Sequence, residues 1–319
     1  MSVVTLRDEL SGSSAQVSID RGFNCFSFQA AVGDQIVDVL DTETGFAAGA
    51  GRPSGNGIPL LFPYPNRIKG GRYSWEGKDY FISPELAGYD RTGNAIHGFC
   101  IDRPWRVIEQ TANSVLGEFQ LSRDAAERRS LWPADCIMRL RYTVSGARLR
   151  AEIEVHNPDS VSLPWGFGTH PYFKLPLGKK SRPDQCLLVA PVCACWDLTD
   201  CLPSGTKHAL PEGLELNDGQ YFGLRRFDDV FSVLPSPVIE CSIIDEAAGL
   251  QVRQTHPGHY PELVIYTPPN RDSICFEPYT CVTDAINLEA QGVASGWQVL
   301  APGASFRSWI DIEAGLVVA

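Results

Sequence analysis

Six polar residues of this chain stand in apolar or aromatic surroundings, where a hydrogen-bonding side chain could do chemistry. They are Asn66, Arg67, His97, His170, Asp228 and Glu277. Glu277 follows the apolar run Ile274–Phe276, where burial would raise its pKa and make it a better proton acceptor near neutral pH. The imidazole of His170 could donate a proton at that pH. The set predicts one base and one acid acting on a small polyhydroxylated substrate, with Asn66 and Arg67 holding hydroxyls or a developing negative charge.

The segment Leu163–Phe173, which contains His170, is rich in glycine and aromatic residues. Because Pro171 follows the histidine, the backbone at His170 is pushed towards an extended conformation. A stiff main chain is a good support for a proton donor, although a buried structural histidine could look the same. Trp165 and Tyr172 could stack on a sugar ring, or they could only wedge the histidine in place.

Each of the other candidates, taken alone, also has an ordinary structural explanation. Glu277 could simply end a strand. Asp228 could pair on the surface with Arg225 or Arg226, and His97 could satisfy a turn. Only their combination favours an acid/base site.

Composition narrows the class of protein. The 319 residues are 44% hydrophobic and 20% charged, as in an ordinary globular protein. The net charge of −11 argues against nucleic acid or an anionic membrane as a partner, since both need a basic surface. The N-terminus does not resemble a signal peptide, so we expect a cytoplasmic protein whose ten cysteines are reduced and mostly buried thiols.

Motifs of several other chemistries do not match. The cysteine cluster at 186, 193, 195 and 201 lacks the usual spacing of zinc ligands, and His256 and His259 lie in a Pro/Gly turn rather than on one helix face. There is no Gly-x-Ser-x-Gly elbow of a serine hydrolase. A glycosidase needs two carboxylates, which Glu277 and Asp228 could supply, so residue types alone leave that alternative open. We therefore expect no metal site in either cluster.

Alternation of apolar and polar residues predicts an all-β fold. Residues 138–144 and 149–155 alternate on either side of Ser145-Gly146, which predicts an antiparallel hairpin with one buried face. Residues 71–82 predict a second hairpin, and residues 201–215 are expected to form a loop. No linker divides the chain. We predict one domain over residues 1–319, built as a large antiparallel β-sandwich.

Five motifs, in this order, resemble those of the aldose 1-epimerases (galactose mutarotases). They are Phe62-Pro63-Tyr64-Pro65-Asn66-Arg67-Ile68, Asn94-Ala95-Ile96-His97-Gly98-Phe99, Gly168-Thr169-His170-Pro171-Tyr172-Phe173, Phe227-Asp228-Asp229-Val230-Phe231 and Phe276-Glu277-Pro278-Tyr279-Thr280. The resemblance implies a galactose-mutarotase-type sandwich that interconverts the α and β anomers of an aldohexose without cofactor or metal.

The resemblance also implies a role for each candidate residue. Glu277 would be the base that takes the proton of the anomeric hydroxyl, and His170 the acid that protonates the ring oxygen. His97 would polarise that oxygen. Arg67 and Asp228 would bind sugar hydroxyls, as would Asn66.

This sequence departs from the family pattern at two places. Asp229 follows Asp228 where many members have histidine, so either aspartate could face the sugar. Residues 260–268 lack the Gln-Pro-Gly segment of galactose-specific members, which leaves the sugar open. Arg52, Arg72 and Arg91 lie near the motifs and could serve the phosphate of a hexose 6-phosphate, although each could equally be a solvated surface residue. A non-catalytic sugar-binding sandwich is the remaining alternative.

Overall fold

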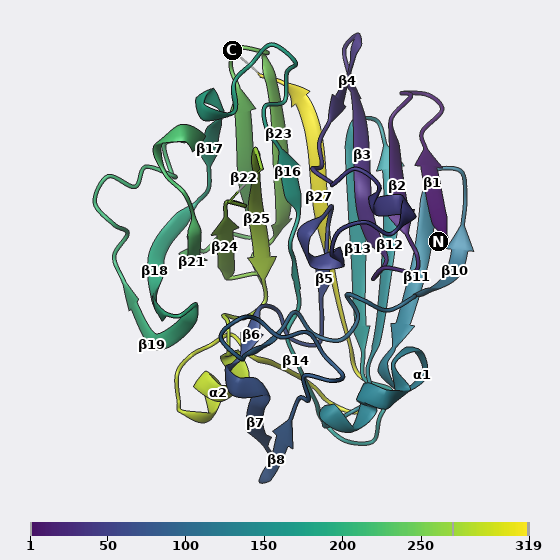
Figure 1. Cartoon of the computed structure of the whole chain (residues 1–319), viewed down its shortest axis with the longest axis vertical. Helices are drawn as coiled ribbons and strands as arrows, with labels where there is room; N and C mark the ends of the chain where they lie inside the picture. The colour runs from purple at the N-terminus through teal and green to yellow at the C-terminus, as the bar shows by residue number, and fades with distance from the viewer. Residues whose placement is uncertain (1, 270, 318–319) are drawn as a thin grey trace.

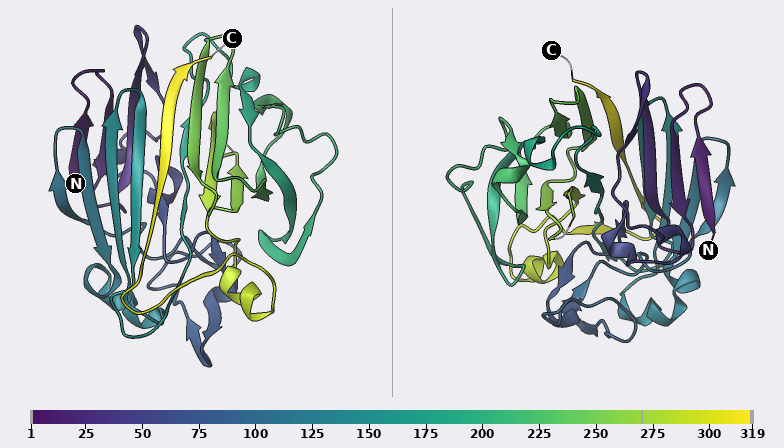
Figure 2. Two further views of the ribbon diagram at one scale, coloured as in Figure 1. Left: turned by 180° about the vertical axis from the view of Figure 1, so that it is seen from behind. Right: turned by 45° about the horizontal axis from the view of Figure 1, so that its top comes forward.

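Large antiparallel sheets facing one another make up most of this protein, as seen in a computed structural model that describes residues 2–269 and 271–317 (Figure 1). A nine-stranded sheet forms the back layer. An eight-stranded sheet and a four-stranded sheet lie side by side in front of it. Seen from behind, the long strand β27 runs through the middle of the back layer (Figure 2). The prediction of a large antiparallel all-β sandwich is confirmed.

The nine-stranded sheet contains the hairpin that the alternating pattern predicted. Its order is β10 (Arg106–Gln110), β11 (Ser114–Gln120), β12 (Ile137–Ser145), β13 (Arg148–His156), β27 (Ser305–Leu316), β23 (Leu250–Pro257), β22 (Val238–Asp245), β17 (Leu187–Val189) and β20 (Gln220–Tyr221). In β12 the apolar residues from Met138 to Val144 are fully buried, while the arginines between them are only partly buried. This period-two burial is what a sheet with one solvated face requires.

The eight-stranded sheet carries most of the candidate site. Its order is β19 (Leu202–His208), β18 (Val192–Thr199), β21 (Asp228–Val233), β24 (Glu262–Tyr266), β25 (Ser273–Tyr279), β15 (Gly168–Thr169) and β5 (Leu60–Leu61), and β16 (Tyr172–Lys174) also pairs with β25. Strand β19 corrects the prediction of a loop over residues 201–215. It lies at the sheet edge, where Pro203 and Gly205 are tolerated because one side of the backbone needs no ladder partner.

The remaining elements are a four-stranded sheet, three two-stranded sheets and short helices. The order of the four-stranded sheet is β1 (Val3–Arg7), β2 (Ser14–Ser18), β3 (Asn24–Val32) and β4 (Gln35–Asp38). Each of the three other sheets has two strands. They pair β14 (Leu163–Trp165) with β26 (Gln298–Leu300), β6 (Arg67–Ile68) with β9 (Ala95–Ile96), and β7 (Arg72–Trp75) with β8 (Lys78–Phe81). The helices are α1 (Leu121–Asp124) and α2 (Ala285–Ala290), together with 3-10 turns at 46–48, 53–55, 69–71, 126–131, 183–185 and 222–224. In the described part of the chain, no helix is long and apolar enough to cross a membrane.

The core fills the space between the layers. A main cluster of buried side chains draws on both layers, from Leu140 and Ile153 at the back to Phe276 in front. A direct hydrogen bond also joins the layers, since Gln254 of β23 donates to the carbonyl of Phe276 on β25 (3.0 Å). The front sheet is thus held on a rigid support, which is what a site built on its outer face needs.

Candidate active site

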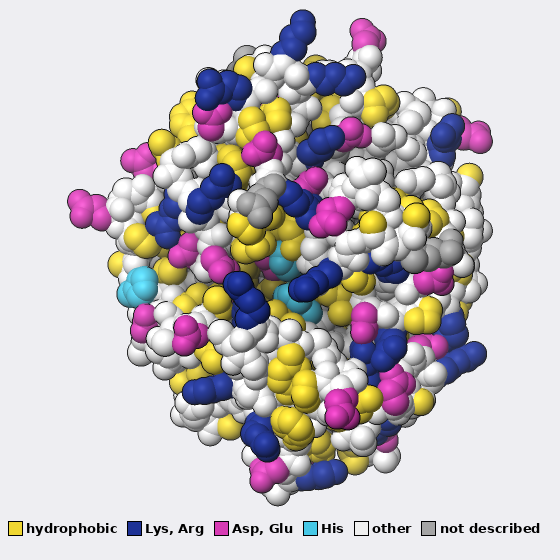
Figure 3. Space-filling model, in the orientation of Figure 1, with side chains coloured by type: hydrophobic (Ala, Val, Ile, Leu, Met, Phe, Trp, Pro, Cys, Tyr) yellow, Lys and Arg dark blue, Asp and Glu magenta, His cyan; other side chains and the backbone are white. Residues whose placement is uncertain are grey.

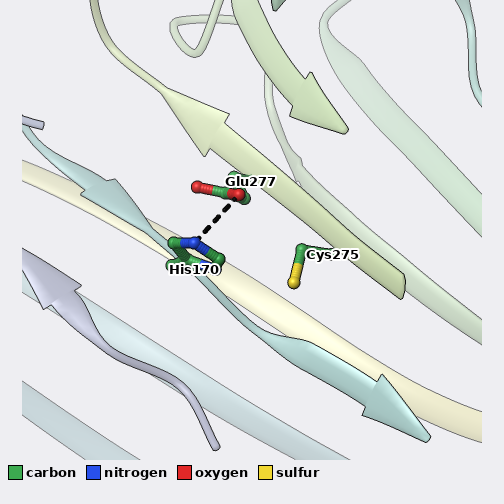
Figure 4. A group of neighbouring side chains, drawn as sticks. All are labelled: His170, Cys275 and Glu277. Atoms are coloured by element: carbon green, nitrogen blue, oxygen red, sulfur yellow. Dashed lines mark ion pairs between the residues drawn. The ribbon is translucent and has the colours of Figure 1, made fainter. Parts of the chain in front are cut away.

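His170 and Glu277 are placed opposite each other by strand pairing. The chain of β15 and β16 runs antiparallel to β25, with Gly168 paired with Tyr279 and Tyr172 with Cys275. Between these two pairs, the register sets His170 across from Glu277. The Nε2 atom of His170 lies 3.2 Å from Oε1 of Glu277 (Figure 4). Two residues more than a hundred positions apart thus form one buried pair.

Both members of this pair are almost fully buried, and burial changes their acidity. Burial raises the pKa of Glu277 well above its usual range, with a hydrogen bond from Tyr279 opposing the shift. Burial, together with neighbouring His97, lowers the pKa of His170 well below its usual range. A buried acid and a buried base in contact are best described as a pair that shares one proton. The form with the proton on His170 and a free carboxylate on Glu277 has a proton donor and an acceptor side by side.

The pair lies at one side of a cavity of about 640 Å³. Asn66, Arg67, His97 and Asp228 line the same cavity. In the space-filling view, histidine side chains lie at the bottom of a hollow that charged side chains surround (Figure 3). The volume is in the range of small-molecule sites. Five sequence segments therefore converge on one pocket.

His97 is held against the pair by an unusual backbone. Its φ is +67° and that of Gly98 is +74°, and a Cβ atom on Gly98 would lie 2.2 Å from the carbonyl oxygen of Phe62. Only glycine fits that approach. The rings of His97 and His170 meet edge to face with centroids 5.8 Å apart. Burial lowers the pKa of His97 to about 3, and Arg67 adds to the shift. The imidazole is therefore neutral at pH 7, with one ring nitrogen that donates a hydrogen bond and one that accepts.

Arg67 is fixed by an aspartate that the sequence reasoning missed. Its Nε atom donates to Asp90 (2.6 Å) and its Nη1 atom to Asn66 Oδ1 (2.7 Å). Burial of Asp90 is outweighed by hydrogen bonds from Asn94 and Arg67, which lower its pKa. The aspartate also accepts hydrogen bonds from Thr92, which closes a tight loop. That Asp-x-Thr-x-Asn spacing was the sequence signal that could have identified Asp90.

The two aspartates of the Phe227–Phe231 motif have different surroundings. Asp228 is exposed and lines the cavity, with Sγ of Cys201 3.8 Å from its carboxylate. Asp229 instead pairs with Arg225 at 3.1 Å. Of the two, Asp228 is the one that can reach a ligand in the cavity.

The position of Trp165 corrects its assignment as a ligand-binding residue. The side chain is 1% exposed, packs on Phe306 with ring centroids 4.8 Å apart, and is absent from the cavity lining. Tyr172, in contrast, stacks on His170 with centroids 4.7 Å apart and donates to the carbonyl of Ser54. It braces the histidine and also lines the cavity.

Two tyrosines of the site were not singled out from the sequence. Tyr266 lines the cavity and presents its ring edge to face with His170, with centroids 5.8 Å apart. Tyr279 donates a hydrogen bond of 2.5 Å to Glu277 Oε2. Tyr279 lies in the motif that was quoted for Glu277, and Tyr266 lies in the segment that lacks Gln-Pro-Gly; neither motif tells which face of its strand a tyrosine occupies.

Three residues at the site have the donor types that zinc prefers. His170, Cys275 and Glu277 offer ligand atoms within 4.8 Å of one another, and all three are buried (Figure 4). In residues 2–269 and 271–317 this is the one such group, so neither the cysteine cluster around Cys193 nor His256 forms one. A metal ion here would occupy the acid and the base that a proton transfer needs.

Two of the three arginines near the motifs reach the cavity. Arg52 and Arg91 line it and are exposed, and among the described residues neither forms an ion pair with a carboxylate. Arg72 lies instead over the ring of Phe81 on the β7–β8 hairpin.

Comparison with known proteins agrees with this architecture. A galactose mutarotase-like protein from Clostridium acetobutylicum superposes with a TM-score of 0.85 at 24% identity, covering 96% of this chain and 93% of its own. The aldose epimerase homologue of C. elegans gives a TM-score of 0.80 at 16% identity, with 99% of each chain covered. These matches place the fold among the galactose mutarotase-like β-sandwiches.

The sequence itself identifies the family. The family model described as aldose 1-epimerase matches residues 3–313, and the chain belongs to this family. The uncharacterized protein YihR of Escherichia coli (strain K12) is 25% identical over 231 residues, which are 72% of this chain and 71% of that protein. The family resemblance inferred from the five motifs is confirmed.

Proposed function

We propose that this protein is an aldose 1-epimerase that interconverts the α and β anomers of an aldohexose. The observation that carries the proposal is the contact between a buried acid and a buried base, His170 and Glu277, beside a cavity large enough to hold a sugar. The anomeric and ring oxygens of a sugar are bonded to the same carbon atom. A base for one oxygen and an acid for the other must therefore be neighbours, as these two residues are.

The reaction needs no co-reactant. Glu277 takes the proton of the anomeric hydroxyl while His170 delivers a proton to the ring oxygen, and the bond between the anomeric carbon and the ring oxygen breaks. The product is the open aldehyde. Rotation about the bond between the first two carbons presents its other face. Ring closure then returns the proton from Glu277 to the new anomeric hydroxyl and the ring hydroxyl proton to His170.

The other cavity residues bind and polarise the sugar in this proposal. The neutral imidazole of His97 assists at the ring oxygen. Arg67, aimed by Asp90, and the neighbouring Asn66 hold hydroxyls, as does Asp228 at the exposed rim. The stiff backbone around His170 keeps the acid in place while the open sugar rotates.

Polarimetry on freshly dissolved α-glucose or α-galactose tests the proposal. The protein should accelerate the approach to the equilibrium rotation, and Glu277→Gln should lose about 10²–10⁴-fold in kcat, the range of a general base. The matched control is Glu152→Gln on the exposed outer side of β13. Saturable sugar binding without turnover would favour a non-catalytic sugar-binding protein. Release of reducing ends from an oligosaccharide would favour a glycosidase.

A second candidate function, 1-epimerisation of a hexose 6-phosphate, is favoured by Arg52 and Arg91. These two exposed guanidinium groups line the cavity and could bind an anionic group on the sugar. The double variant Arg52→Ala/Arg91→Ala should then lose about 10–100-fold in kcat/KM for the 6-phosphate, since hydrogen bonds to charged groups are the stronger ones. Activity on the free sugar should be kept, and Arg72→Ala serves as control. Equal wild-type rates on both sugars would contradict this candidate.

A further inference from the structure

Tyr279 has a contact with Glu277 that the proposed proton transfers do not use. It follows Glu277 by two positions on β25, so both side chains lie on the same face of the strand. The side chain is fully buried, and its hydroxyl donates a 2.5 Å hydrogen bond to Oε2 of Glu277. The other carboxylate oxygen, Oε1, faces His170. Each oxygen of the base therefore has its own partner, and Tyr279 and His170 together set the plane of the carboxyl group.

Gly168 supplies the space that the tyrosine ring needs. It is the residue paired with Tyr279 across β15 and β25. A Cβ atom on Gly168 would lie 2.2 Å from Cδ1 and 2.5 Å from Cε1 of that ring. Such distances cannot be accommodated without moving the tyrosine. Gly168 thus lies opposite Tyr279 across the two strands, as His170 lies opposite Glu277. The motif that contains His170 and the motif that contains Glu277 are therefore in contact at two positions.

The tyrosine remains a hydrogen-bond donor in this contact. Burial raises the pKa of Tyr279 well above its usual range, so the phenol keeps its proton and can donate a hydrogen bond to Glu277.

We propose that Tyr279 is a positioning residue that aims the carboxyl group of Glu277, and that Gly168 is required because it makes room for Tyr279. The role in turnover rests on the proposed epimerase function. The effect on the carboxylate does not, because it is a property of the free protein.

The first test is Tyr279→Phe, assayed by polarimetry. Loss of the hydrogen bond that aims the base should lower kcat by about 10-fold with little change in KM. Tyr73→Phe is the matched control. It also removes a buried tyrosine hydroxyl, which donates to the carbonyl of Leu131 away from the cavity, and it should leave kcat and KM unchanged.

The second test needs no substrate. Infrared difference spectra against Glu277→Gln isolate the carboxyl band of Glu277, and its frequency should shift in Tyr279→Phe, because the band depends on the hydrogen bonds that the group accepts. Gly168→Ala, which displaces the ring, should shift the band in the same direction. An unchanged frequency in folded Tyr279→Phe would overturn the proposal. A shifted frequency in a protein without epimerase activity would uphold the placement of Glu277 and reject the proposed function.

Discussion

Replacing Glu277 by glutamine should stabilise the protein while it abolishes the proposed activity. The amide keeps the shape of the side chain. Its oxygen can accept from Tyr279, and its NH2 group can donate towards His170. What is lost is the ionisable group, so the variant separates the cost of ionising a buried carboxyl from its use.

The sign of the stability change follows from the raised pKa of Glu277. In the unfolded chain this carboxyl ionises near its ordinary value of about 4.5, whereas in the folded protein burial holds the proton to higher pH. The folded state therefore binds more protons between these two values, and stability falls as pH rises through that window. The amide does not titrate. The advantage of Glu277→Gln should be smallest at pH 4 and grow as pH rises.

The magnitudes differ for the two properties. Each unit of pKa difference corresponds to about 1.4 kcal/mol, and 1 kcal/mol raises the Tm of a large domain by about 2 °C. Removal of a general base costs about 10²–10⁴-fold in rate, which is a barrier increase of about 3–5 kcal/mol.

Thermal and urea unfolding at pH 4–8, with polarimetry on the same preparations, measures both effects. Glu152→Gln, which removes an exposed carboxylate, provides the baseline. The reasoning is refuted if Glu277→Gln is less stable than the wild type at pH 8, or if the difference in unfolding free energy does not depend on pH.

Three further predictions concern the surroundings of the pair. Gly98→Ala should destabilise the fold by more than about 2 kcal/mol, because a Cβ atom would meet the carbonyl of Phe62 at a positive φ; a Tm equal to the wild type would contradict this. Asp90→Ala should release Arg67 and raise KM about 10-fold with a smaller change in kcat, whereas an unchanged KM would show that the ion pair does not serve sugar binding. Added Zn²⁺ should inhibit turnover, and EDTA should restore it. Cys275→Ser should raise the half-inhibiting concentration of Zn²⁺ at least about 10-fold. Equal inhibition of the wild type and of this variant would exclude the thiol as a ligand.

Much of the fold and of the candidate site followed from local patterns. Period-two alternation predicted the β12–β13 hairpin residue by residue, because a strand with one buried face has an apolar side chain at every second position. The five motifs identified the family, and Asn66, Arg67, His97, His170, Asp228 and Glu277 all line one cavity. The prediction of a single domain over residues 1–319 stays a prediction, as do the cytoplasmic location and the absence of a cofactor.

What the sequence did not determine depends on which residues face one another across strands. Whether Trp165 faced a ligand or the core was open, and packing against Phe306 put it in the core. Asp228 and Asp229 are adjacent along the chain, and only the tertiary structure decided which one lines the cavity. Strand β19 was missed because its proline and glycine are acceptable only at a sheet edge, a position that no local pattern specifies.

The sequence by itself determined the chemistry that is available, a carboxylate and an imidazole in apolar motifs, since residue type and local context are local properties. The tertiary structure decided that these two groups touch. The pairing of β15 and β16 with β25 joins segments about a hundred residues apart. It places Gly168 opposite Tyr279 and His170 opposite Glu277. The acid/base pair is thus a consequence of strand register, which long-range packing determines.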